Sequence, residues 1–130
     1  MTQKRILVID DDSAVRDAFR LALRKGPYTL LEADNGETGA SLAVAEDVDL
    51  VYLDLRMPGI DGVETLRRIR AAKPDLTVYI ATAFHRELFD DLVTARGEGL
   101  EFELLRKPLR RQQILDITNG VLGGDPTTEG

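Results

Sequence analysis

Short hydrophobic runs alternate along this chain with longer segments in which apolar residues recur every three or four positions. The runs are rich in Ile, Leu and Val and predict buried strands at 5–9, 29–33, 49–53, 76–81 and 102–105. The segments between them have the apolar spacing of helices, at 13–25, 36–46, from a cap at Asp61 to just before Pro74, 86–96 and 110–122. Five such units predict an α/β fold: a doubly wound, flavodoxin-like, five-stranded parallel sheet with helices on both faces.

Polar residues at the predicted helix starts are suited to capping. Asp12, Asn35 and Asp61 are each expected to accept a hydrogen bond from a free backbone N–H group of the first turn. The apolar residues of the fourth helix that we expect to point inward are Leu88, Phe89, Leu92 and Val93. In the last helix, Ile114, Ile117 and Val121 are predicted to lie on one face.

The composition narrows the class of protein. The 130 residues suffice for one domain, placed at 1–122, and residues 123–130 are predicted to be a disordered tail or the stub of a linker. With no Cys and one His, disulfides, zinc–thiolate sites and multi-histidine sites are excluded. The net charge of −6 disfavours direct nucleic-acid binding. Without a long apolar run or a signal-peptide pattern, we expect a cytoplasmic protein with no membrane span.

Polar residues follow several of the predicted strands at their carboxyl ends. Asp10 and Asp11 come after the first strand, Asp54 after the third, Thr82 after the fourth and Lys107 after the fifth. In open α/β sheets these ends share one edge, where ligands bind. Carboxylates gathered there repel one another, and a divalent cation removes that cost. We therefore predict Mg²⁺ bound by Asp11 and Asp54, with Asp10 either binding the ion through a water molecule or contacting its direct ligands.

A carboxylate beside a bound cation can also accept a phosphoryl group. The equatorial oxygens of a phosphoryl group on Asp54 would need neutralisation, which Mg²⁺, the Lys107 ammonium and the Thr82 hydroxyl could supply. Phe84 follows Thr82 closely and is expected to overhang this site.

The chain resembles the receiver domains of two-component response regulators and is similar to the stand-alone chemotaxis regulator. The resemblance extends from Lys4 to about Val121. It is carried by the segments Ile6–Asp12, Asp54–Gly62, Ala81–Ala83 and Lys107–Pro108, in this order and spacing.

The resemblance implies a role for each of these positions. Asp54 would be the phosphoacceptor, with Lys107 and Thr82 as the switch lysine and hydroxyl, and the Lys107–Pro108 peptide would be cis. The implied metal ligands are Asp10, Asp11, Asp54 and the backbone carbonyl of Arg56. The implied partners are a sensor histidine kinase or histidine phosphotransfer protein, and a downstream protein target or output domain. A phosphorylation-linked homodimer is also implied. Such a protein catalyses only its own phosphorylation and slow dephosphorylation.

Two positions depart from the family pattern. The aromatic residue that usually stands three positions before the switch lysine is replaced by Leu104, and the nearest aromatic is Phe102. The segment 95–101 also lacks the usual form before the fifth strand. We therefore expect a smaller rearrangement of this face on activation. The alternative function is a pseudo-receiver with the same fold, which docks or dimerises without phosphotransfer.

Overall fold

The computed structural model describes residues 3–83 and 86–123, and for residues 86–88 it describes the backbone alone. The strands are β1 (Lys4–Ile9), β2 (Tyr28–Ala33), β3 (Leu50–Leu53), β4 (Thr77–Thr82) and β5 (Glu103–Arg106). The helices are α1 (Ser13–Leu23), α2 (Gly36–Ala45), α3 (Gly62–Ala72), α4 (Arg86–Gly97) and α5 (Arg111–Leu122). The predicted elements are all present, and their bounds differ by a few residues. Of the predicted tail, Gly123 is described and the remainder lies outside the described residues.

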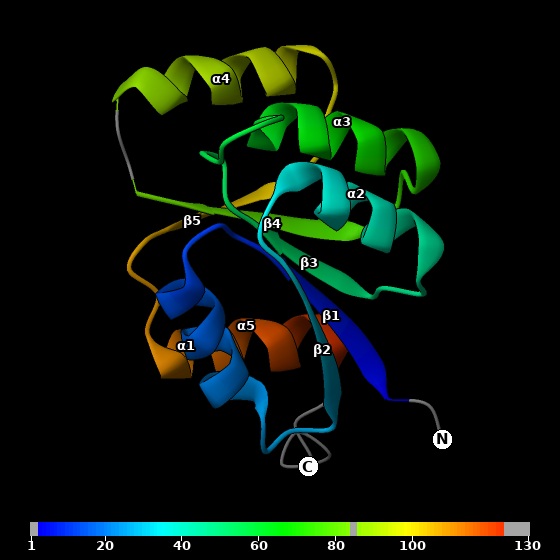
Figure 1. Ribbon diagram of the computed structural model, residues 1–130, viewed down its shortest axis with the longest axis vertical. Coiled ribbons are helices and arrows are strands. Elements are labelled where there is room, and N and C mark those ends of the chain that lie inside the picture. Colours follow the sequence, from blue (N-terminus) through cyan, green and yellow to red (C-terminus); the bar gives the residue numbers. More distant parts are fainter. Residues whose placement is uncertain (1–2, 84–85, 124–130) are drawn as a thin grey trace.

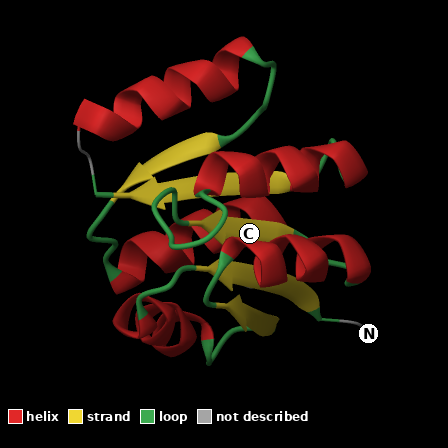
Figure 2. Ribbon diagram, turned by 45° about the horizontal axis from the view of Figure 1, so that its top comes forward, coloured by secondary structure: helices red, strands yellow, loops and turns green. Residues whose placement is uncertain are grey.

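Within the described part of the chain, the strands form one parallel sheet in the order β2-β1-β3-β4-β5. Helices α1 and α5 cover one face, and α2, α3 and α4 lie on the other (Figure 1). Figure 2 shows the same sheet between its two helical layers. The predicted doubly wound architecture is confirmed. Strand β2 lies on one side of β1 and β3 on the other, so the strand order reverses beside β1. In open α/β sheets, ligands bind at the carboxyl ends of the strands at such a point.

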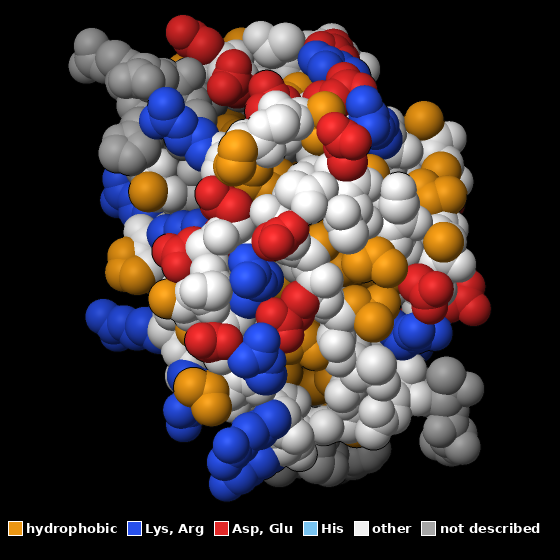
Figure 3. All heavy atoms as spheres, viewed as in Figure 1, with side chains coloured by type: hydrophobic (Ala, Val, Ile, Leu, Met, Phe, Trp, Pro, Cys, Tyr) orange, Lys and Arg blue, Asp and Glu red, His pale blue; other side chains and the backbone are white. Residues whose placement is uncertain are grey.

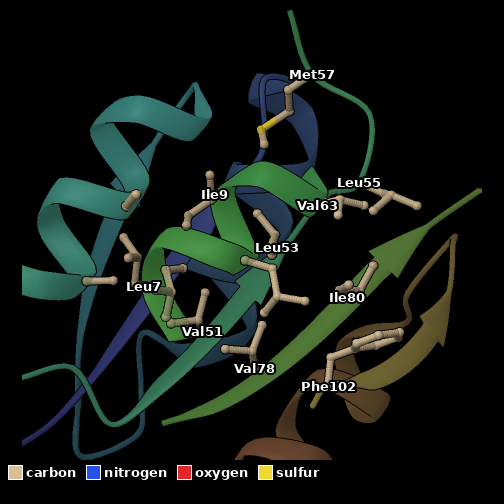
Figure 4. Close-up of a cluster of buried hydrophobic side chains, with 14 of the residues drawn as sticks. Leu7, Ile9, Val51, Leu53, Leu55, Met57, Val63, Val78, Ile80 and Phe102 are labelled. Atoms are coloured by element: carbon tan, nitrogen blue, oxygen red, sulfur yellow. The ribbon is translucent and has the colours of Figure 1, made fainter. Parts of the chain in front are cut away.

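Alternating residues of the central strands supply two separate hydrophobic clusters. Leu7 and Ile9 of β1 join the larger cluster beneath α2 and α3, whereas Ile6 and Val8 join the cluster beneath α1 and α5. Figure 4 shows part of the larger cluster. Because both faces are buried, β1 is apolar at consecutive positions rather than at every second one. Each such side chain contributes roughly 1.5–3 kcal/mol when fully buried.

The predicted caps are confirmed. Asp12 accepts a hydrogen bond from the backbone N–H of Ala14, Asn35 from that of Thr38, and Asp61 from that of Glu64. Helix α1 ends two residues earlier than predicted, at Leu23, whose carbonyl accepts a hydrogen bond from the N–H of Gly26.

The prediction for α4 is wrong in part. Leu92 is buried, but Phe89 and Val93 are each 53% exposed, and the side chain of Leu88 lies outside the described set. Helix α4 borders α3 and the short edge strand β5 (Figure 1), and among its described side chains Leu92 and Ala95 are the ones that are buried. Helical spacing alone cannot tell an apolar face that packs inward from one that stays at the surface.

The C-terminal end of α4 and the loop after it are held by three arginines. Arg67 of α3 makes two hydrogen bonds of 2.7 Å to the Glu98 carboxylate, and Arg70 donates to the carbonyl of Glu101 at 2.9 and 2.6 Å. Arg96 lies 4.1 Å from the ring centroid of Phe102 and donates to its carbonyl. Phe102 is thereby fixed in the core, where it is 4% exposed.

Acidic and basic side chains lie next to one another over the middle of the face shown in Figure 3. None of the helices in the described part of the chain is long and apolar enough to cross a membrane.

Gly62, the first residue of α3, packs backbone against backbone on the segment that follows Asp54. Its N–H donates to the carbonyl of Leu55 at 2.9 Å. A Cβ at this position would lie 2.5 Å from the Leu55 Cα and 2.7 Å from the Asp54 carbonyl oxygen. The start of α3 therefore supports the loop that carries Asp54, and a side chain there would push the two apart.

We predict that Gly62→Ala lowers the free energy of unfolding by about 1–3 kcal/mol, because the backbone of Asp54 and Leu55 must move away from the added Cβ. The matched control is Gly120→Ala in α5, where no atom lies within 4 Å of the added Cβ. That change should stabilise the protein by about 0.5–1 kcal/mol, because alanine favours helix. Urea unfolding of both variants measures the difference, and a neutral Gly62→Ala would contradict the close packing.

Candidate functional site

Three carboxylates converge at the carboxyl edge of the sheet. Asp10, Asp11 and Asp54 each offer an oxygen, and these oxygens all lie within 4.8 Å of one another. The cause is strand register: Ile9 of β1 is opposite Leu53 of β3, so the residues that follow both strands meet. The N–H of Asp54 also donates to the carbonyl of Ile9 at 2.9 Å, extending the pairing into the site.

The three carboxyl groups differ in exposure. Asp10 and Asp54 are 3% and 7% exposed, whereas Asp11 is at the surface. Two carboxylates are therefore shielded from water and a third faces it. This is an oxygen-rich, partly open set of donors of the kind that hard divalent cations prefer.

Lys107 supplies the positive charge that partly balances these carboxylates. Its Nζ lies 2.7 Å from Oδ2 of Asp10 and 3.4 Å from Oδ1 of Asp54. Its backbone N–H donates to the carbonyl of Thr82 at 2.9 Å, which anchors the loop after β5 to the end of β4. The Lys107–Pro108 peptide is cis, as the resemblance implied.

Asp54 is unusually basic for an aspartate. Burial is the main cause and the charge of Asp10 the second, and together they raise its pKa from 3.8 to about 6 against the opposing effects of its other neighbours. The charge of Lys107 and a backbone hydrogen bond from Arg56 lower the pKa but do not cancel these effects. Burial would by itself lower the pKa of Lys107, yet this pKa is raised because the hydrogen bond to Asp10 and the charge of Asp54 outweigh it.

Thr82 is buried at the end of β4, next to Lys107 in the fold. Its hydroxyl donates to the carbonyl of Ala83 at 3.2 Å, so it is bonded locally. Arg56 is exposed, two residues after Asp54. Phe84 and His85 lie outside the described residues. The structure thus gathers Asp10, Asp11, Asp54 and Lys107 closely and leaves Thr82 beside them with its hydroxyl turned to its own neighbour.

Two contacts around Asp10 were not predicted from the sequence. The N–H of Asp12 donates to Oδ1 of Asp10 at 2.9 Å, and Nη1 of Arg16 donates to the Asp10 carbonyl at 2.6 Å. Arg16 stands four residues after the capping Asp12. That spacing, one helical turn from a cap beside an acidic run, is the signal that could have drawn attention to it.

The model of the family described as the response regulator receiver domain matches residues 6–119. This chain belongs to that family. A receiver domain is a module of two-component signalling rather than a classical enzyme, and the pocket of Asp10, Asp11, Asp54 and Lys107 is the arrangement expected around a phosphoacceptor aspartate. Receiver domains in general act with histidine kinases and output domains.

Among curated relatives, the response regulator MprA of Mycolicibacterium vanbaalenii is 34% identical over 111 residues. The match covers 85% of this chain and 47% of that protein, so the receiver domain spans about half the length of this relative.

Solved structures share the fold. A CheY-like receiver domain protein from Methanospirillum hungatei superposes with a TM-score of 0.81 at 23% identity, covering 98% of this chain and 99% of that one. The response regulator TrrA of Thermotoga maritima has a TM-score of 0.75 at 29% identity, covering 91% and 98%. That protein was solved in complex with Mg²⁺ and beryllofluoride.

We predict that Asp54→Asn raises the free energy of unfolding of the metal-free protein by about 1–3 kcal/mol at pH 7, because the fold disfavours the charged carboxylate. The penalty in the wild type is present above pH about 6 and disappears as the pH falls toward 3.8, where folded and unfolded chains both hold the proton. Urea unfolding across this range should show the gain shrinking.

The control is Asp11→Asn, which neutralises the exposed member of the same cluster. We expect it to leave the metal-free fold no less stable, with a change within about 0.5 kcal/mol. An Asp54→Asn protein that is less stable than the wild type at pH 7 would show that Lys107 outweighs burial.

Proposed function

We propose that this receiver domain accepts a phosphoryl group on Asp54 from a phosphohistidine of a sensor kinase or a phosphotransfer protein. The observation that carries the proposal is the position of the Asp54 carboxylate. It is within 4.8 Å of oxygens of both Asp10 and Asp11, and Oδ1 is 3.4 Å from the Lys107 ammonium. A nucleophile, a cation-binding group and a fixed positive charge are therefore available at one point.

The residues present fit a Mg²⁺ ion. We assign it to Asp10, Asp11, Asp54 and the backbone carbonyl of Arg56, all of them oxygen donors, as Mg²⁺ requires. The carboxylates exceed the neighbouring ammonium in charge, so the pocket favours a divalent cation. When bound, the ion would neutralise charge on the oxygens of the phosphoryl group.

The remaining steps are assigned to side chains. An oxygen of Asp54 forms its bond to phosphorus as the nitrogen–phosphorus bond of the donor breaks. At pH 7 most Asp54 carboxyl groups are ionised, since the pKa is about 6. Lys107 already lies between Asp10 and Asp54, and we assign it to an oxygen of the transferred group. Thr82 would exchange its bond to the Ala83 carbonyl for one to the phosphoryl group.

The output is a change in protein contacts. We propose that phosphorylation alters binding to a downstream protein or an attached output domain, or forms a homodimer, and that the domain acts in the cytoplasm. The length of MprA beyond the matched region supports an output elsewhere in a longer protein.

We predict that Asp54→Asn abolishes incorporation of label from acetyl phosphate in the presence of Mg²⁺, because the amide cannot act as the nucleophile. The matched control is Asp12→Asn. Asp12 caps α1, and asparagine caps equally well, so this variant should be labelled at the wild-type rate. Labelling of Asp54→Asn at that rate would disprove the assignment, and a wild-type protein that takes no label would favour the pseudo-receiver.

We predict that beryllofluoride with Mg²⁺ shifts amide resonances mainly at residues 54–60 and 82–90, with small changes at 102–106. The reason is that Leu104 carries no ring to bury, and Phe102 is already held in the core by Arg96. Two-dimensional amide spectra with and without beryllofluoride provide the measurement. Changes of equal size through 102–106 would contradict it.

A further inference from the structure

The backbone of Asp10 is bound by β2 and α1, elements that carry none of the carboxylates of the cation pocket. Its N–H donates to the carbonyl of Ala33 in β2 at 3.0 Å, and its carbonyl accepts from Nη1 of Arg16 at 2.6 Å. Its carboxylate is bound by Lys107. Asp10 is therefore fixed by both its backbone and its side chain.

Arg16 is itself held in place. Its Nε lies 3.5 Å from Oε1 of Glu32, and its side chain is 19% exposed. Glu32 precedes Ala33, so Arg16 and the backbone of Asp10 both fasten the turn after β1 to the end of β2. Arg20 binds the same Glu32 carboxylate at 2.8 Å, but its side chain is 54% exposed and it also pairs with Asp17.

We infer that Arg16 is a positioning residue for the cation site. By holding the Asp10 carbonyl, it sets where the carboxylates of Asp10 and Asp11 stand relative to Asp54 across the strands. Mg²⁺ tolerates little departure from octahedral geometry, so a small rotation of this turn changes its affinity. This inference rests on the proposed function, because it concerns the same cation.

If charge were all that mattered, removal of Arg16 would strengthen Mg²⁺ binding, because a guanidinium near a cation site repels the cation. If Arg16 positions the turn, its removal weakens Mg²⁺ binding even though a repelling charge is lost. The sign of the change separates the two.

The test is a Mg²⁺ titration of the unphosphorylated protein, followed by amide shifts at residues 54–60. For Arg16→Met we expect the dissociation constant for Mg²⁺ to rise about tenfold, the scale found for groups that orient metal ligands. Labelling by acetyl phosphate should slow most at low Mg²⁺, and the loss should shrink as Mg²⁺ is raised, because the nucleophile and Lys107 are still present. Arg16→Lys, which restores a donor, should recover part of the affinity.

Arg20→Met is the matched control. It removes a cation from the same helix and the same Glu32 carboxylate without touching Asp10, and it should bind Mg²⁺ as the wild type does. If Arg16→Met does not fold, Glu32→Gln carries the test, with a smaller loss of affinity expected.

The inference is overturned if Arg16→Met binds Mg²⁺ as tightly as the wild type or more tightly. The same result for Glu32→Gln overturns it where that variant takes over the test. It is also overturned if Arg20→Met loses as much Mg²⁺ affinity as Arg16→Met. A wild-type protein that binds no Mg²⁺ would instead refute the proposed function.

Discussion

The pairing of β1 with β3 is the constraint on which the site depends. Ile9 opposite Leu53 brings the residues after both strands to the same level, and those residues are aspartates. The apolar side chains behind them bury this edge, so the fold forces Asp10 and Asp54 together in a place where water screens them poorly.

Lys107 offsets only part of the repulsion. It is closer to Asp10 than to Asp54, so one carboxylate is well paired and the other remains costly to ionise, with its pKa near 6. The ionised Asp54 carboxylate lowers the stability of the fold, and neutralisation of its charge by a cation would offset that cost. Gly62 and Arg16 serve the same arrangement from outside, the first by supporting the loop after Asp54 and the second by holding the turn after β1.

The contacts that hold the C-terminal end of α4 differ from those of the acidic pocket. The C-terminal end of α4 is tied to α3 by Arg67 and Glu98, and the ring of Phe102 is held beneath Arg96. Nearer the N-terminal end of α4, Phe89 and Val93 remain exposed. Position 104 thus carries a leucine without a ring, whereas the aromatic residue two positions earlier, Phe102, is fixed in the core. The residue before β5 is therefore held by α4 and by the core together.

The sequence by itself determined the order of the strands and helices, their caps, and the aspartates and lysine at one edge, because these depend on local periodicity and on the rule that parallel strands end together. Only the tertiary structure decided which apolar residues of α4 are buried, since that depends on which elements pack against the helix. It also decided that Lys107 favours Asp10, that the Thr82 hydroxyl bonds to Ala83, and that Arg16 holds the Asp10 carbonyl. These contacts join residues whose separation is set by packing in three dimensions, which no local pattern records.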